Sequence, residues 1–215
     1  MPSFWPNGIA SNTEILDGNT EAQIASIYAF TMQGGGDPEG FPDYDSLDFE
    51  IIPTERPVIQ RSFMKRIGTD VLLVGFPAGI HLAFNSATGT PALLWKGRFY
   101  DAYTTWFSRF PEFENPLGEA VIRWPTPSQE NEFRYLGYRI NGASSVEILL
   151  SKGNTSVVEE YQPQLSDHGE ILMRRTIRFD GIEPDITSLP THPIGVEWTE
   201  TTSADPLTRT FLYRW

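Results

Sequence analysis

From residue 47 to its end, the chain repeats short apolar or alternating runs separated by turn residues, and this pattern constrains the fold most. Runs of about four to eight residues, spaced by roughly ten and bounded by Gly, Pro, Asn and Asp, are typical of β-sandwiches and barrels. The predicted strands are Leu47–Pro53, Val58–Met64, Val71–Phe76, Ile80–Asn85, Ala92–Trp95, Phe133–Ile140, Val146–Leu150, Ser156–Tyr161, Ile171–Phe179, Gly195–Trp198 and Arg209–Trp215. The sequence therefore predicts an all-β fold, an antiparallel β-sandwich of about ten or more strands.

The alternation of side chains indicates which faces of these strands are buried. Val71–Val74 is apolar at every position, so this strand is predicted to be buried on both faces. In Ile171–Phe179 the odd-numbered residues form a mostly apolar face that includes Arg175, because successive side chains of a strand point to opposite sides. Pro77–Gly79, between two such strands, is a candidate hairpin turn.

One helix is predicted ahead of the strands. Thr20 and Gln23 fit a capping box, apolar residues follow at helical spacing, and Gly34–Gly36 ends the run, which predicts an α-helix over residues 20–33. A segment rich in Gly, Pro and Asp follows and is typical of a linker. The predicted domains are an N-terminal segment with one helix at 1–36, a linker at 37–46 and a β-sandwich domain at 47–215.

The chain carries a formal net charge of −12 and contains no cysteine. A strongly acidic surface repels phosphate backbones, so we expect no nucleic-acid partner. Without cysteine there is no disulfide, no thiolate metal site and no covalent haem attachment within this chain. No apolar run approaches the ~20 residues of a membrane-spanning helix, and the first residues lack the features of a signal peptide. We therefore expect no membrane span.

Several segments, taken in order, resemble one family of multidomain haem proteins. They are Met1–Pro6, Asn19–Met32, Glu55–Met64, Val74–Asn85 and Trp95–Asp101. The first two resemble the end of a class I cytochrome c domain, in which a Met-Pro segment precedes a final amphipathic helix. The others resemble the β domain that follows the cytochrome in exported haem proteins of the planctomycete type. The resemblance covers residues 1–125, and beyond them only the strand-rich style is shared.

The resemblance implies a place in an exported electron-transfer protein. By position, Met1 would be the axial haem ligand, because a Met thioether binds the iron opposite a His in such cytochromes; Met1 is equally well an initiator methionine. The family's CxxCH segment is absent, so no cofactor is expected in this chain, and haem c is implied only for the full-length relative. The β domain would be a non-catalytic module that docks the haem domain or a redox partner, in the periplasm or outside the cell.

The segment at 98–110 is the most aromatic and least regular part of the chain. Its candidate ligand- or partner-binding residues are Arg98, Tyr100, Asp101, Tyr103 and Trp106. If they are exposed, these side chains could form a platform for sugar rings or for a redox protein; if they are buried, they are core residues with one Arg–Asp pair. An acidic β-sandwich with such a segment is therefore also consistent with a carbohydrate-binding module that takes a polysaccharide.

No motif in the sequence indicates a catalytic reaction or a metal site. No GxSxG occurs, and the three histidines, His81, His168 and His192, are not spaced as zinc ligands. A glycan-active enzyme, the third hypothesis, needs two close carboxylates, and Asp101 and Glu119 are the first pair to test for that role. The sequence thus favours a non-catalytic module and predicts neither catalytic nor metal-ligating residues.

Overall fold

The structure of the protein is a computed structural model that describes most of the strand-rich part of the chain. The described residues are 50–101, 115–126, 133–180, 192–204 and 207–215. The chain divides into two compact units, Met1–Phe49 and Glu50–Trp215, and all described residues belong to the second unit. Met1, the predicted helix at 20–33 and the predicted linker at 37–46 lie outside the described residues.

The described residues form strands β1 to β13 and contain no helix. The strands are β1 (Glu50–Ile51), β2 (Val58–Met64), β3 (Gly68–Gly75), β4 (Ile80–Asn85), β5 (Thr90–Lys96), β6 (Tyr100–Asp101), β7 (Glu119–Arg123), β8 (Arg134–Asn141), β9 (Ser145–Lys152), β10 (Thr155–Leu165), β11 (Ile171–Asp180), β12 (Glu197–Ala204) and β13 (Leu207–Arg214). In this part of the chain, no helix is long and apolar enough to cross a membrane. Every strand pairing is antiparallel, so the predicted all-β, antiparallel fold class is confirmed for the described residues.

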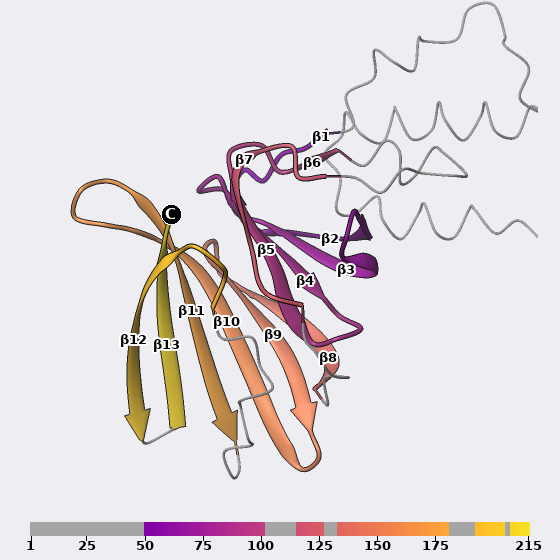
Figure 1. Ribbon diagram of the computed structural model, residues 1–215, viewed down its shortest axis with the longest axis vertical. Helices are drawn as coiled ribbons and strands as arrows, with labels where there is room; N and C mark the ends of the chain where they lie inside the picture. Colours follow the sequence, from indigo (N-terminus) through magenta and orange to yellow (C-terminus); the bar gives the residue numbers. More distant parts are fainter. Residues whose placement is uncertain (1–49, 102–114, 127–132, 181–191, 205–206) are drawn as a thin grey trace, which may run out of the picture. The chain divides into compact units, whose positions relative to one another are not determined.

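The strands form three sheets, whose members run side by side in Figure 1. The largest sheet has six strands in the order β12-β13-β11-β10-β9-β8, and the second has five in the order β2-β3-β4-β5-β7. The third is a two-stranded ladder of β1 and β6. Most neighbours in the two larger sheets are also neighbours in the sequence, as expected where short turns connect antiparallel strands.

The main core lies between the inner faces of the two larger sheets. A single cluster of buried side chains joins Leu72 and Val74 of β3 with Ile148 of β9 and Tyr213 of β13. These residues occupy alternate positions along their strands, so one face of each sheet is removed from water. Full burial of one such apolar side chain contributes about 1.5–3 kcal/mol. The arrangement is sandwich-like, as the spacing of the apolar runs predicts.

A second core covers the opposite face of the five-stranded sheet. It contains Val71 and Leu73 of β3, Trp95 of β5 and Tyr100 of β6. The β1–β6 ladder therefore lies on the side of this sheet that the six-stranded sheet does not cover. The prediction that Val71–Val74 is buried on both faces is confirmed, since alternate residues of this run enter the two cores.

Only β2 and β4 have the predicted bounds; most other predicted strands differ at one or both ends, and two strands are not predicted at all. The pattern does not predict β6 or β7, because β6 has only two residues and the apolar part of β7 is short. The predicted strand at 195–198 is wrong at both ends, since β12 spans Glu197–Ala204. Its second half is Thr-Thr-Ser-Ala, and β-branched threonine supports a strand without giving the apolar signal on which the prediction depends.

Candidate functional site

A charged cluster lies inside the core, on the inner face of the six-stranded sheet. Arg175 donates two hydrogen bonds to Glu159, from Nε to Oε2 over 3.0 Å and from Nη2 to Oε1 over 2.7 Å. The hydroxyl of Tyr161 donates to Oε2 of the same carboxylate over 2.5 Å. Both charged side chains are 0% exposed, so the pair is a structural element of the core rather than a contact for ligands. The prediction that Arg175 lies on a mostly apolar face is confirmed.

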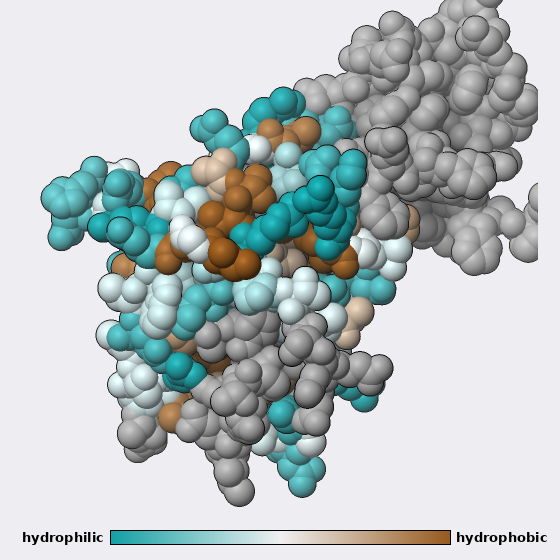
Figure 2. All heavy atoms as spheres, in the orientation of Figure 1, coloured by the Kyte–Doolittle hydropathy of each residue, from teal (hydrophilic) through white to brown (hydrophobic). Residues whose placement is uncertain are grey.

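The outer face of the six-stranded sheet carries a row of polar residues, with one residue from each strand. In the strand register the row runs through Arg139, Glu147, Glu160, Thr176, Thr210 and Thr201. In β9, β10, β11 and β13 these positions alternate with buried residues, so their side chains point away from the five-stranded sheet. Arg139 and Thr201 of the edge strands lie opposite members of the row and therefore share its face. In Figure 2 the lower part of the unit, over the six-stranded sheet, is mostly hydrophilic, whereas hydrophobic residues gather in the upper part.

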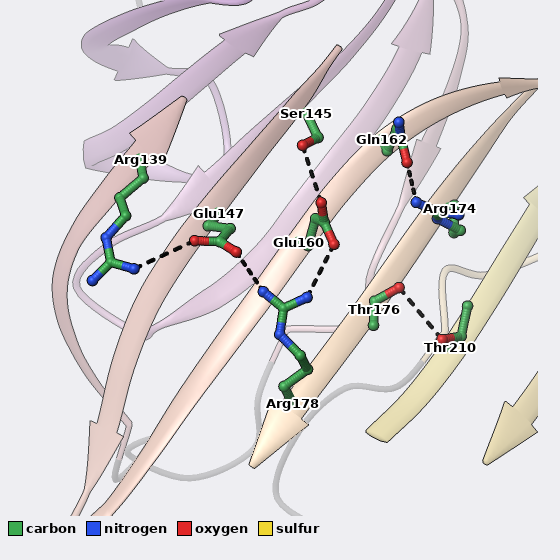
Figure 3. A network of polar contacts seen from close by, with 9 residues as sticks. All are labelled: Arg139, Ser145, Glu147, Glu160, Gln162, Arg174, Thr176, Arg178 and Thr210. Atoms are coloured by element: carbon green, nitrogen blue, oxygen red, sulfur yellow. Dashed lines mark hydrogen bonds and ion pairs between the residues drawn. The ribbon is translucent and has the colours of Figure 1, made fainter. Parts of the chain in front are cut away.

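Ion pairs hold the charged half of this row in place (Figure 3). Arg178 lies between Glu147 and Glu160, and its Nη1 donates to Glu160 Oε2 over 3.1 Å while its Nη2 pairs with Glu147. Arg139 approaches the other oxygen of Glu147 at 3.6 Å, and Ser145 donates its hydroxyl to Glu160 over 3.0 Å. These contacts therefore link Arg139 of β8, Glu147 of β9, Glu160 of β10 and Arg178 of β11 into one network.

Arg178 and Arg139 both pair with Glu147, yet we expect very different effects when each is removed. Arg178→Ala should lower the free energy of unfolding by about 1–2 kcal/mol, because two mostly buried carboxylates lose a charged donor. Arg139→Ala should change it by less than about 0.5 kcal/mol, since the Arg139 side chain is 65% exposed. Urea unfolding of both variants measures the difference, and similar values would show that Arg178 does not bridge the two carboxylates.

A groove of about 490 Å³ lies at one end of the same face. Leu172 and Leu212 give it an apolar lining, and Thr199, Glu197 and Arg214 add polar groups. In the register Thr199 lies opposite Leu212 and Glu197 lies opposite Arg214, so the four side chains share the outer face. Hydrogen-bonding groups and an apolar floor are therefore combined beside the polar row.

The candidate residues of the aromatic segment occupy different environments. Tyr100 is fully buried, and its hydroxyl shares a 2.5 Å hydrogen bond with Ser62 Oγ, which favours the interpretation of this residue as part of the core. Arg98 is exposed and donates from Nε and Nη2 to the carboxylate of Glu50, with a shortest contact of 2.6 Å. Asp101 lies opposite Glu50 in the β1–β6 ladder. Tyr103 and Trp106 lie outside the described residues.

The three histidines lie in separate parts of the fold. His81 is buried in β4, where its Nδ1 accepts from the Phe76 amide over 3.2 Å and its Nε2 lies 2.7 Å from the Gly97 carbonyl oxygen. His168 lies in the turn after β10, and the ring of His192 stacks on Trp198 at 3.5 Å. Burial lowers the pKa of His192. Within the described ranges, no three side chains of His, Cys, Asp or Glu are grouped as metal ligands.

The polar row is not among the site residues predicted from the sequence. A signal exists in the alternating threonines Thr199 and Thr201 and again in Thr208 and Thr210, since each pair places two hydroxyl groups on one face of a strand. The strand register aligns both pairs with Glu147 and Glu160. This register is set by the turns and by contacts across the core, and the local sequence pattern does not specify it.

Comparison with protein-family models, with curated proteins and with solved structures finds no match to this chain.

Proposed function

We propose that the strand-rich unit is a non-catalytic binding module of an exported cytochrome c-type protein, which docks the haem domain or a redox partner through the outer face of the six-stranded sheet. The observation that carries this proposal is the polar row that crosses all six strands of that sheet. A regular sheet face with fixed charges can meet a complementary partner with little rearrangement.

The order of segments in the sequence supports the haem context of this proposal. Met1–Pro6 and Asn19–Met32 resemble the end of a class I cytochrome c domain, and they precede the strand-rich unit as they do in the family. In a longer relative, haem c would be attached to a segment upstream of the sandwich-like unit. This unit would then position the haem domain. Met1 would then occupy the place of the axial ligand.

The ion pairs of the face suit it to specific docking. Glu147, Glu160 and Arg178 restrain one another, so much of the entropy cost of ordering these long side chains is already met during folding. The network places charges of both signs at fixed positions on the face, and a partner must present the complementary pattern to bind. Such a pattern favours one partner over other charged proteins, because a mismatched surface would place like charges together.

The test is the affinity of the chain for a class I cytochrome c domain of a planctomycete-type haem protein, measured by titration calorimetry. Arg139→Glu reverses an exposed charge of the row and is expected to weaken binding at low salt by at least about five-fold. Arg56→Glu is the matched control, because Arg56 is exposed and lies outside the sheets. Equal loss in both variants would count against the face, and absence of binding by the unaltered chain would remove the haem-docking role.

A carbohydrate-binding module is the second candidate, and the groove beside the row favours it. Leu172 and Leu212 could contact the apolar face of a sugar ring while Thr199 and Glu197 meet its hydroxyl groups. Electrophoresis through gels that contain a polysaccharide tests this candidate by the retardation of the chain. Thr199→Trp would fill the groove and should abolish retardation, so a polysaccharide that still retards this variant binds elsewhere.

A further inference from the structure

A second cavity, of about 260 Å³, lies among three segments at the ends of strands in the five-stranded sheet. Arg66 lines it from the turn between β2 and β3, Thr88 from the turn between β4 and β5, and Arg123 and Trp124 from the end of β7. No residue of the polar row contributes to it. An inference from this cavity is therefore independent of the proposed docking role.

Two arginines line this cavity, and neither Arg66 nor Arg123 forms an ion pair with a described residue. Most other arginines of the described residues do pair with a carboxylate; they are Arg98, Arg139, Arg175, Arg178, Arg209 and Arg214. A guanidinium group is a fixed fork of donors that suits carboxylate and other oxyanion groups. The cavity is thus lined by two such groups whose charge the described residues leave uncompensated.

The turn that contains Arg66 requires a backbone conformation that arginine rarely adopts. A hydrogen bond from the Ile67 amide to the Met64 carbonyl oxygen over 3.1 Å closes the turn, and Arg66 is its third residue. The φ of Arg66 is +66°, in the left-handed region that glycine enters without strain. Arginine thus stands where glycine would suit the backbone better, which is consistent with a role for its side chain.

Hydrogen bonds hold the lining segments together. Asn85 accepts from the amides of Ala87 and Thr88 over 3.0 and 3.2 Å, and its Nδ2 donates to the Ile67 carbonyl oxygen over 3.4 Å. This side chain therefore connects the turn of Arg66 with the turn of Thr88. The carbonyl oxygen of Arg123 accepts from the Ile194 amide over 2.8 Å, which fixes the third segment. A site with lining fixed before binding loses less entropy when a ligand enters.

The cavity also offers neutral polar groups and apolar walls. Trp124 is only 5% exposed. Its indole Nε1 is buried and has no hydrogen-bond acceptor among the described residues. The hydroxyls of Thr88 and Thr90 lie 2.7 Å apart, and Pro91 and Ile67 add apolar surface. The lining thus combines charge, hydroxyl groups and an aromatic ring, whereas a site for a bare inorganic ion needs only charge and hydrogen-bond donors.

The distribution of charge along the chain removes an apparent objection to an anionic ligand. The net charge of −12 would repel an anion if it were spread evenly. All 16 Lys and Arg residues lie in Glu50–Trp215, and none lies in Met1–Phe49. The same unit contains 20 of the 28 Asp and Glu residues, since eight lie in Met1–Phe49, so its net charge is only −4. Repulsion of an anion by this unit is therefore weaker than the net charge of the whole chain suggests.

We infer that this cavity binds a small organic acid, of the size of one sugar ring, whose carboxylate pairs with Arg66 and Arg123 and whose carbon skeleton lies against Pro91 and Trp124. The volume is below the roughly 300–1,000 Å³ of pockets for drug-sized ligands, so it fits a single small molecule. A hydroxylated acid such as a uronic acid also finds partners in the threonine hydroxyls.

Titration calorimetry of the full chain with glucuronate, glucose and inorganic sulfate tests this inference. Glucuronate is expected to bind at least about ten-fold more tightly than either of the other two, because glucose lacks the charge and sulfate lacks the carbon skeleton. Sulfate that binds as tightly as glucuronate would overturn the organic-acid assignment. No binding of glucuronate at millimolar concentration would overturn the site as a whole.

Arg66→Gly separates the ligand role from a structural one. The variant should weaken glucuronate at least about ten-fold, and its melting temperature should not fall, because glycine relieves the strained φ. Arg123→Gln should weaken glucuronate similarly, whereas Arg56→Gln, at an exposed arginine outside the cavity, should leave the affinity unchanged. Unaltered affinity in Arg66→Gly, or a lower melting temperature in that variant, would contradict the inference.

Discussion

Replacing Glu159 with alanine is expected to lower the free energy of unfolding by about 3–5 kcal/mol. The variant leaves the charge of Arg175 in the core, 0% exposed, after both hydrogen bonds to the carboxylate are lost. Tyr161 loses the acceptor of its buried hydroxyl as well. Urea unfolding at pH 7, followed by tryptophan fluorescence, measures the loss.

An exposed ion pair provides the matched control for this variant. Glu170 and Arg214 approach to 3.2 Å, but their side chains are 54% and 50% exposed, so Glu170→Ala should cost less than about 1 kcal/mol. The double variant Glu159→Leu with Arg175→Met should be more stable than Glu159→Ala alone, because it leaves no charge in the core. If Glu159→Ala costs no more than Glu170→Ala, the pair is not buried as described.

Lowering the pH from 7 to 4 is expected to remove about 3 kcal/mol of stability through His81 alone. Burial lowers the pKa of His81 from 6.5 to about 4, against a smaller opposing effect of its hydrogen bond to Gly97. The unfolded chain takes up a proton at this residue below pH 6.5, while the folded chain keeps it neutral until about pH 4. The contribution is therefore complete above pH 6.5 and is lost as the pH falls toward 4.

The geometry around His81 gives the physical reason for this pH dependence. Nδ1 accepts from the Phe76 amide, so a proton on that atom would face another N–H group. The rings of Trp95 and Phe99 lie 5.5 and 5.0 Å away and offer little solvation to a charged imidazole.

The measurement compares the unaltered chain with His81→Gln, each unfolded by urea at pH 7 and at pH 4. Other titrating groups contribute equally to both chains, so the extra loss of about 3 kcal/mol in the unaltered chain belongs to His81. A titration of the His81 ring by NMR gives the same information if the variant is too unstable. Equal pH dependence in both chains, or a ring that titrates near pH 6.5, would refute the expectation.

The strands and their buried faces could be predicted because they follow from local alternation. Val58–Met64 and Ile80–Asn85 begin and end where the apolar pattern places them. β7 escapes the pattern because its apolar run, residues 120–122, is only three residues long. Which distant strand completes a sheet depends on packing across the core, and no local run of residues specifies it.

The candidate surfaces are harder to predict, because each is assembled from segments distant in the sequence. The place of Arg175 on an apolar face can be expected from alternation, but its partner Glu159 is found only through the β10–β11 register. The burial of Tyr100 is decided by the two-stranded ladder with β1. The cavity of Arg66 and Arg123 needs two turns and the end of β7 to meet, and two arginines without an ion pair give no pattern in the sequence.

The most direct test of the docking role is an NMR titration of the ¹⁵N-labelled chain with a class I cytochrome c domain of a planctomycete-type haem protein. We expect shift changes that are confined to the outer face of the six-stranded sheet, with Arg139, Thr201 and Thr210 among the most affected amides. These changes should shrink as salt is added. Changes centred on the five-stranded sheet, or no changes at millimolar cytochrome, would contradict the docking role.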